Sequence, residues 1–130
     1  MPPTLNQLFL MVTDLDRSVR FYRDVLDLSV VEERDSQAVF DTGECSLVVE
    51  EDFDAETLAG FNLDPPGDDR GDGAIVVLEV DDVEAAYETA ADADVGETLT
   101  EPRRVDWGRE LFLVADPDGY VVEVSRPVSE

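Results

Sequence analysis

The stretch that decides the fold is LFLMVTDLDRSVRFYRDVL, residues 8–26. Its first part alternates apolar side chains at Leu8, Leu10 and Val12, a period of two that predicts a strand with one covered face. Asp14 follows, and its carboxylate is suited to cap the free N–H groups of a first helical turn. From Leu15 onward, apolar residues recur at helical spacing and form one stripe. The stretch therefore predicts a strand that runs directly into an amphipathic helix.

The same unit occurs a second time between Val76 and Ala90. Three identical pairs lie at a constant offset: Leu10 and Leu78, Val12 and Val80, and Asp14 and Asp82. An apolar stripe at helical spacing again follows the second Asp. A repeat of this kind predicts a duplicated module.

Short strands bounded by turn residues follow each helix. We expect them at Ser29–Glu33, Ala38–Asp41, Ser46–Val49, Glu97–Thr100, Leu111–Ala115 and Tyr120–Ser125. Each module therefore reads βαβββ, and the predicted fold class is α+β. One domain spans residues 1–130, with module one at about 4–52 and module two at about 73–127. Between them, about 53–72, lies an exposed acidic linker rich in Asp, Gly and Pro, with a helical turn at Ala55–Ala59.

Charge is the dominant compositional feature. The chain has 33 acidic and 9 basic residues, a formal net charge of −24, and every basic residue is Arg. Nucleic acids and anionic membranes are excluded as partners, because both require Lys and Arg to neutralise phosphates. Repulsion on this scale is screened where the Debye length falls to about 3 Å near 1 M salt. The composition resembles that of halophile proteins and predicts a salt-rich cytoplasm.

The expected compartment is cytoplasmic. Cys45 is the only cysteine, so no intrachain disulfide forms, and residues 1–4 lack the basic and apolar regions of a signal peptide. No apolar run approaches the roughly 18 residues of a membrane span.

Strand alternation assigns faces to the predicted sheets. Leu8, Leu10, Val12, Val76, Leu78, Val80, Val122 and Val124 are expected to face the helices. The opposite face then carries Gln7, Phe9, Met11, Leu47, Val49, Ile75, Val77, Val121, Glu123 and Ser125. An apolar face with a few polar points is typical of a small-molecule pocket.

Two phrases resemble a known family. Residues 12–26 resemble the opening of many vicinal oxygen chelate proteins, the glyoxalase, bleomycin resistance and dioxygenase group. Trp107-Gly108-Arg109, followed by Asp116-Pro117-Asp118-Gly119 and residues 120–123, resembles the closing signature of that group. The resemblance covers nearly the whole chain. It implies two βαβββ modules that form a curved mixed sheet around a cleft, within one chain or across a homodimer.

In metal-dependent members of this group, four equivalent strand positions hold a divalent cation. The resemblance places them at Gln7, Ile75, Leu47 and Glu123, of which only Gln7 and Glu123 have donor atoms. Transition metals favour imidazole, and the chain contains no His. We therefore expect no metal cofactor. Glu50, as a substitute, falls on the face opposite Leu47, and a surface role is expected for it.

Two functions remain open. The first is a metal-free binding module that resembles the bleomycin resistance proteins and holds a small molecule in the cleft, with Trp107 for stacking and Arg104 or Arg109 for an anionic group. The second is a lyase or isomerase resembling glyoxalase I or an epimerase, with Glu123 as general base or metal ligand. The binding hypothesis is preferred. Its expected ligand-binding residues are Gln7, Phe9, Leu47, Ile75, Val77, Arg104, Trp107, Arg109, Val121 and Glu123.

Overall fold

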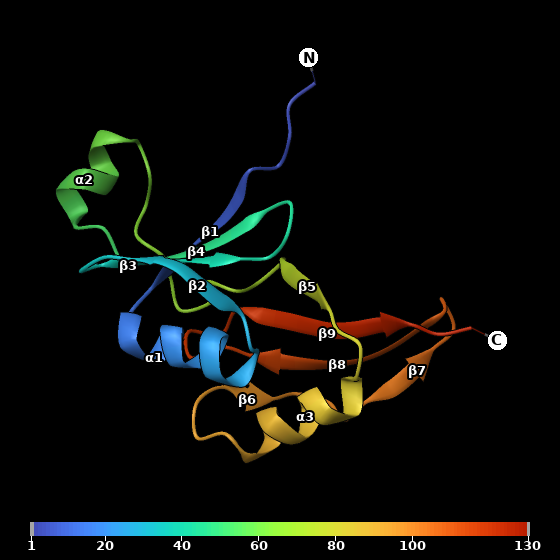
Figure 1. Cartoon of the computed structure of the whole chain (residues 1–130). Helices are drawn as coiled ribbons and strands as arrows, with labels where there is room; N and C mark the ends of the chain where they lie inside the picture. The colour runs from blue at the N-terminus through green and yellow to red at the C-terminus, as the bar shows by residue number, and fades with distance from the viewer. Residues whose placement is uncertain (1, 130) are drawn as a thin grey trace. The chain divides into compact units, whose positions relative to one another are not determined.

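A computed structural model describes residues 2–129 of the chain. The fold divides into two compact units, of which the first ends at Asp68 and the second begins at Asp69. This boundary lies inside the segment that we expected to be a linker. Each unit has its own mixed sheet (Figure 1).

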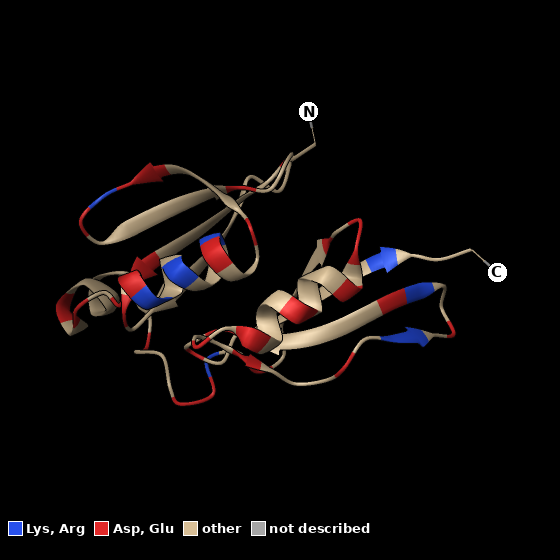
Figure 2. Ribbon diagram, turned by 60° about the horizontal axis from the view of Figure 1, so that its bottom comes forward, with Lys and Arg blue, Asp and Glu red and all other residues tan. Residues whose placement is uncertain are grey.

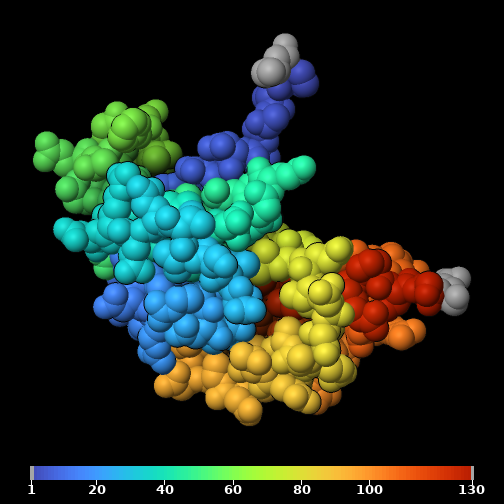
Figure 3. Space-filling view, viewed as in Figure 1, coloured from blue at the N-terminus to red at the C-terminus, as the bar shows by residue number. Residues whose placement is uncertain are grey.

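The first unit is built around a four-stranded sheet. Its elements are β1 (Gln7–Val12), α1 (Leu15–Val19), η1 (Arg20–Val25), β2 (Ser29–Glu33), β3 (Gln37–Asp41), β4 (Ser46–Glu51) and α2 (Ala55–Gly60). The strand order is β1-β4-β3-β2, in which β1 runs parallel to β4 and the other neighbours are antiparallel. Residues 2–6, which precede β1, extend away from the rest of this unit (Figure 3), and Leu5 among them is exposed.

The helix of the first unit begins where Asp14 predicts it. The Asp14 carboxylate accepts a hydrogen bond from Arg17 N at 3.2 Å, and the helix continues beyond α1 as a π-helical segment, η1, in which Leu26 N donates to Phe21 O. Phe21 and Tyr22 are fully buried. The Tyr22 ring contacts Phe40 of β3 at a centroid distance of 5.8 Å. The helix thus covers the sheet face that carries Phe40.

The second unit repeats this plan with one additional strand. Its elements are β5 (Ile75–Glu79), α3 (Val83–Asp92), β6 (Glu97–Thr98), β7 (Arg103–Val105), β8 (Arg109–Ala115) and β9 (Val121–Pro127). The order is β5-β9-β8-β6, and β7 also pairs with β8. Asp82 caps α3 by accepting from Ala85 N at 3.0 Å. Tyr87 of α3 meets Phe112 of β8 edge to face, with 5.3 Å between ring centroids.

The predicted α+β class and the two βαβββ modules are confirmed. The strand β7 was not predicted, because its three residues include two charged arginines and show no apolar alternation. β6 is shorter than the expected Glu97–Thr100, because Leu99 N and Thr100 N both donate to Leu113 O and the regular pairing ends there.

The segment 53–72 is only partly the exposed linker that we expected. It contains α2, whose Leu58 is buried, and Gly71 is buried as well. A Cβ atom at Gly71 would collide with the carbonyl oxygen of Gly119. Glycine is therefore required where this segment crosses the turn before β9.

That turn, Asp116-Pro117-Asp118-Gly119, is held by one buried carboxylate. Asp116 Oδ1 accepts hydrogen bonds from Asp118 N and Tyr120 N, each at 2.9 Å. Gly119 has φ +91°, which an L-residue rarely adopts. The turn fixes where β9 begins and hence which of its residues face α3.

Over residues 2–129, no helix combines the length and the apolar character needed to cross a membrane.

Candidate functional site

Each sheet has one face covered by its helix and one face turned away from it, which we call the open face. Pairing decides which residues share a face, because partners across a ladder point to the same side. In the second unit Val122 and Val124, 0% and 1% exposed, face α3 together with Phe112. The residues that alternate with them form the open face.

The open face of the second unit is largely apolar. Ile75 and Val77 of β5 are each 56% exposed there. Val77 pairs with Glu123, which in turn pairs with Leu113 of β8, so the Glu123 carboxylate lies between two apolar side chains. Within the described part of its own unit, Glu123 has no hydrogen-bond or ion-pair partner. Ile75, Val77, Val121, Glu123 and Ser125 thus lie on the face that strand alternation predicted.

Arg109 is held in place at one end of this face. Its Nη2 donates to Ser125 Oγ at 2.9 Å and to Glu79 Oε1 at 3.1 Å. The side chain is 25% exposed. Ser125, which is fully buried, and Glu79 were not predicted as site residues, although both follow from the same alternation that places Val77 and Glu123.

The other predicted aromatic and basic residues do not join Arg109. Arg104 pairs with Glu110, which lies on the same side of β8 as Phe112 and therefore on the helix side. Arg104 is thus on the wrong face of β7 for the predicted site. Its neighbour Arg103 pairs with Leu111 and lies on the open face instead. Trp107 occupies the turn between β7 and β8 and is 68% exposed.

The first unit corrects one predicted face. β1 pairs with β4 so that Gln7, Phe9 and Met11 share a face with Ser46, Val48 and Glu50. Leu47 and Val49 lie on the helix side, where Leu47 pairs with Phe40. Our placement of Leu47 and Val49 on the open face was wrong.

The physical reason is a difference of one residue between two turns. β4 begins three residues after Gly43, whereas β9 begins two residues after Gly119. A shift of one residue reverses every side chain of a strand. Counting from the glycine therefore gave Leu47 as the repeat mate of Glu123, but the register gives Val48: Phe9 pairs with Val48 as Val77 pairs with Glu123.

The open face of the first unit differs from its counterpart by being partly covered. Phe53, just after β4, packs against Phe9 with 6.0 Å between ring centroids, and Val48 is 2% exposed. Glu50 lies on this face and accepts a hydrogen bond from Gln37 Nε2 at 2.7 Å. We had expected only a surface role for Glu50, because strand alternation placed it on the face opposite Leu47, and Leu47 had been assigned to the wrong face.

The donor set for the metal that the fold family implies is incomplete. The register-equivalent positions are Gln7 and Val48 in the first unit and Ile75 and Glu123 in the second. Val48 and Ile75 present only hydrocarbon, and an amide and one carboxylate fall short of the usual ligand count. Among residues 2–129, no three His, Cys, Asp or Glu side chains are grouped to hold an ion. These residues do not fit a divalent metal.

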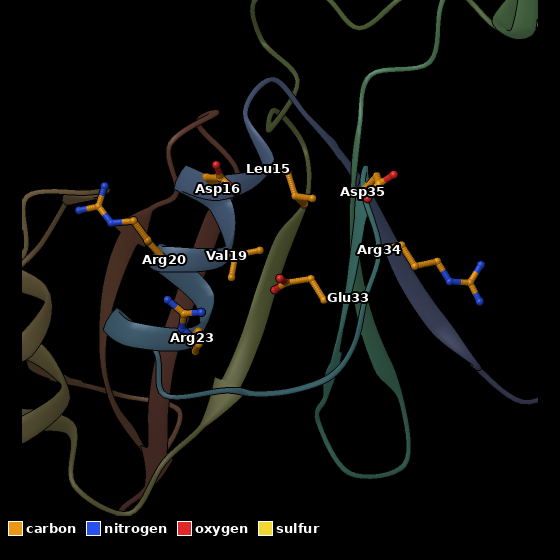
Figure 4. Close-up of a pocket in the computed structure, with 8 residues that line it drawn as sticks. All are labelled: Leu15, Asp16, Val19, Arg20, Arg23, Glu33, Arg34 and Asp35. Atoms are coloured by element: carbon orange, nitrogen blue, oxygen red, sulfur yellow. The ribbon is translucent and has the colours of Figure 1, made fainter.

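A separate hollow of about 440 Å³ lies on the helix side of the first unit. Figure 4 shows Leu15, Val19 and Glu33 facing its middle, whereas Arg20 and Arg34 extend away from it. Arg34 pairs with Glu32, and Arg23 with Asp24, each at 2.8 Å. The hydrogen bond from Arg23 lowers the pKa of Asp24. Because Arg23 and Arg34 are paired to neighbouring carboxylates, this hollow is a solvated groove rather than a built binding site.

Acidic residues are distributed over both units, along the helices and in the loops (Figure 2). Arginines are few, and in the second unit two ion pairs lie on different faces of the same sheet. Arg126 Nε bonds Glu110 Oε1 at 2.8 Å on the helix side, and Arg109 bonds Glu79 on the open face. The open face of the second unit is thus the best-defined candidate site.

Known proteins resemble the chain over nearly all of its length. An uncharacterized Bacillus subtilis protein, YraH, is 27% identical over 94% of this chain and 97% of its own. A probable lactoylglutathione lyase of Synechocystis is 28% identical over 92% of each chain. A crystal structure of an Agrobacterium tumefaciens protein of unknown function superposes with a TM-score of 0.80 at 27% identity, covering 98% of this chain and 97% of the other.

The family assignment follows from a sequence model that matches residues 4–124, nearly the whole chain. The duplicated βαβββ plan agrees with it. The chain belongs to the Glyoxalase/Bleomycin resistance protein/Dioxygenase superfamily.

Proposed function

We propose that this chain binds a small organic molecule on the open face of its second unit and uses no metal to do so. One observation carries the proposal: the exposed side chains of Ile75 and Val77 and the half-buried side chain of Leu113 form an apolar surface beside the Glu123 carboxylate. An apolar surface with few polar points is the common composition of ligand sites. The polar points would orient the ligand, and the apolar ones would supply most of its burial.

The second candidate is catalysis of the lyase or isomerase type with Glu123 as general base. Likeness to a probable lactoylglutathione lyase favours it, as does the position of Glu123 between Val77 and Leu113. Such catalysis needs a positive group to stabilise the negative charge that proton removal creates on the substrate. Arg109 does not supply it, because its guanidinium is bound to Glu79 and Ser125. The binding role therefore comes first.

A fragment screen on the full chain at molar salt tests the proposal. Amide resonances of isotope-labelled protein should shift on β5 and β9 with apolar fragments, and Val121→Asp should abolish those shifts without unfolding the chain. Fragments that shift only residues of the helix-side hollow would overturn it. Turnover of lactoylglutathione by the metal-stripped protein, lost in Glu123→Gln, would establish the second candidate instead.

The setting of this function is also proposed. We place the protein in a salt-rich cytoplasm, because its net charge is −24. We also propose a homodimer, because β1, an edge strand of sequence QLFLMV, carries no charge to protect its edge. Uncharged apolar edges favour pairing with another chain. A solution mass near 14.4 kDa by light scattering at molar salt would contradict the dimer.

A further inference from the structure

Among the described residues, the open face of the second unit carries two arginines, Arg109 and Arg103, and the guanidinium of Arg109 binds partners other than Glu123. Arg109 lies on the same face but gives Nη2 to both Ser125 Oγ and Glu79 Oε1. The remaining cation on this face, Arg103, is on β7, separated from β9 by β8. Two strand spacings amount to about 10 Å.

The separation between Arg109 and Glu123 is set by the strand. Ser125 and Glu123 are two residues apart on β9 and point to the same side, which places their Cα atoms about 7 Å apart. A guanidinium that binds Ser125 is therefore one step along the strand from Glu123. Arg109 lies opposite Pro127, four residues from Glu123 and hence about 14 Å away along β9. Released from Ser125 and Glu79, the Arg109 side chain would pair with Glu123 once both side chains extend toward each other.

The consequence for ligand choice follows from the charges. Glu79 neutralises Arg109, and Glu123 keeps an uncompensated charge between Val77 and Leu113. A half-buried carboxylate beside apolar surface gains most from a cationic hydrogen-bond donor. We infer that this face selects an organic cation, an ammonium or guanidinium group on an apolar body, and that Glu79 and Ser125 preserve this selectivity by holding Arg109 away from Glu123.

This inference rests on the proposed small-molecule binding function. It assigns Glu123 as the binding residue and Glu79 and Ser125 as positioning residues that do not touch the ligand. The net charge of −24 would also raise the local concentration of cations, although that attraction is non-specific and is screened by salt.

The test uses three probes of similar size: phenethylammonium, neutral 2-phenylethanol and anionic 3-phenylpropanoate. Titrations of the full chain at molar salt, followed by amide shifts on β5 and β9, should show the cation binding about tenfold more tightly than the alcohol. The anion should bind most weakly. Glu123→Gln should remove the preference for the cation while affinity for the alcohol is retained.

Positioning is tested with the pair Glu79→Gln and Ser125→Ala. Together they should weaken phenethylammonium binding to the level of the alcohol, because Arg109 then occupies Glu123. Adding Arg109→Met to this double variant should restore cation binding, which a merely structural role would not predict. The matched control is Glu110→Gln, which removes the partner of Arg126 on the helix side and should leave all three affinities unchanged.

Equal affinity for the cation and the alcohol, or a failure of Arg109→Met to rescue, would overturn the inference. In both cases the proposed function would still stand if 2-phenylethanol shifts the amide resonances of β5 and β9. If none of the three probes shifts these strands, the inference fails, and the fragment screen alone then decides the proposed function.

Discussion

Val48 and Glu123 occupy the same position in their two units, as valine in one and glutamate in the other. Each lies in the strand that pairs in parallel with the first strand of its unit, opposite Phe9 and Val77 respectively. The duplication has therefore kept the backbone position and changed its chemistry. A carboxylate at only one of the two positions leaves the family's metal site without a complete donor set.

The first prediction concerns metal content. Protein purified without an affinity tag, exposed to excess Zn²⁺, Mn²⁺, Ni²⁺ or Fe²⁺ and desalted at molar salt, should retain no stoichiometric metal by elemental analysis. High salt is needed because exposed carboxylates attract cations weakly and non-specifically. About one metal per chain, lost in Glu123→Ala, would contradict the metal-free proposal and favour the lyase or isomerase.

The strand-to-helix units were predictable because local signals agree there. Asp14 and Asp82 mark both helix starts, and the structure shows each as the cap. Alternation also placed Ile75, Val77 and Glu123 together, because β5 and β9 have no irregularity in their register.

The site was less predictable, because it depends on loop length and on side-chain partners. One additional residue between Gly43 and β4 exchanged the faces on which Leu47 and Val48 lie. No local sequence pattern indicates the length of that turn. The bonds from Arg109 to Glu79 and Ser125 join three strands, so only the pairing of β5, β9 and β8 brings them together.

The second prediction tests the two faces of β9. Val122→Asp places an unpaired charge under α3, where Val122 is fully buried, and should cost about 3 kcal/mol or more of unfolding free energy. Val121→Asp, its neighbour on the partly exposed open face, should cost less than about 1 kcal/mol and reduce fragment binding instead. Denaturant unfolding measures the free energy of unfolding of both variants, and equal losses of that free energy would show that the faces are assigned wrongly.

The third prediction tests the cap of α3. Asp82→Ala removes the acceptor for Ala85 N and should lower the free energy of unfolding by about 1 kcal/mol. Asp81→Ala is the matched control, since it removes the same charge next to the cap without serving as the acceptor. If the two variants lose equal stability, the effect is one of charge or composition and the cap contributes nothing.

The last prediction concerns salt. With 33 acidic and 9 basic residues, mutual repulsion lowers the stability of the compact state when counterions are scarce. Thermal unfolding followed by circular dichroism should therefore shift to higher temperature between low and molar KCl, with most of the gain reached once the Debye length falls to about 3 Å near 1 M. A variant with Asp68, Asp69 and Asp72 changed to Asn removes three exposed charges that have no side-chain partner among the described residues. Its midpoint should exceed that of the wild type at low salt and approach it at molar salt, because screening then does what the substitutions did. A wild-type midpoint that is flat or falls with KCl, or a variant whose advantage is the same at both salt concentrations, would show that repulsion does not limit stability and would remove the physical basis for a salt-rich setting.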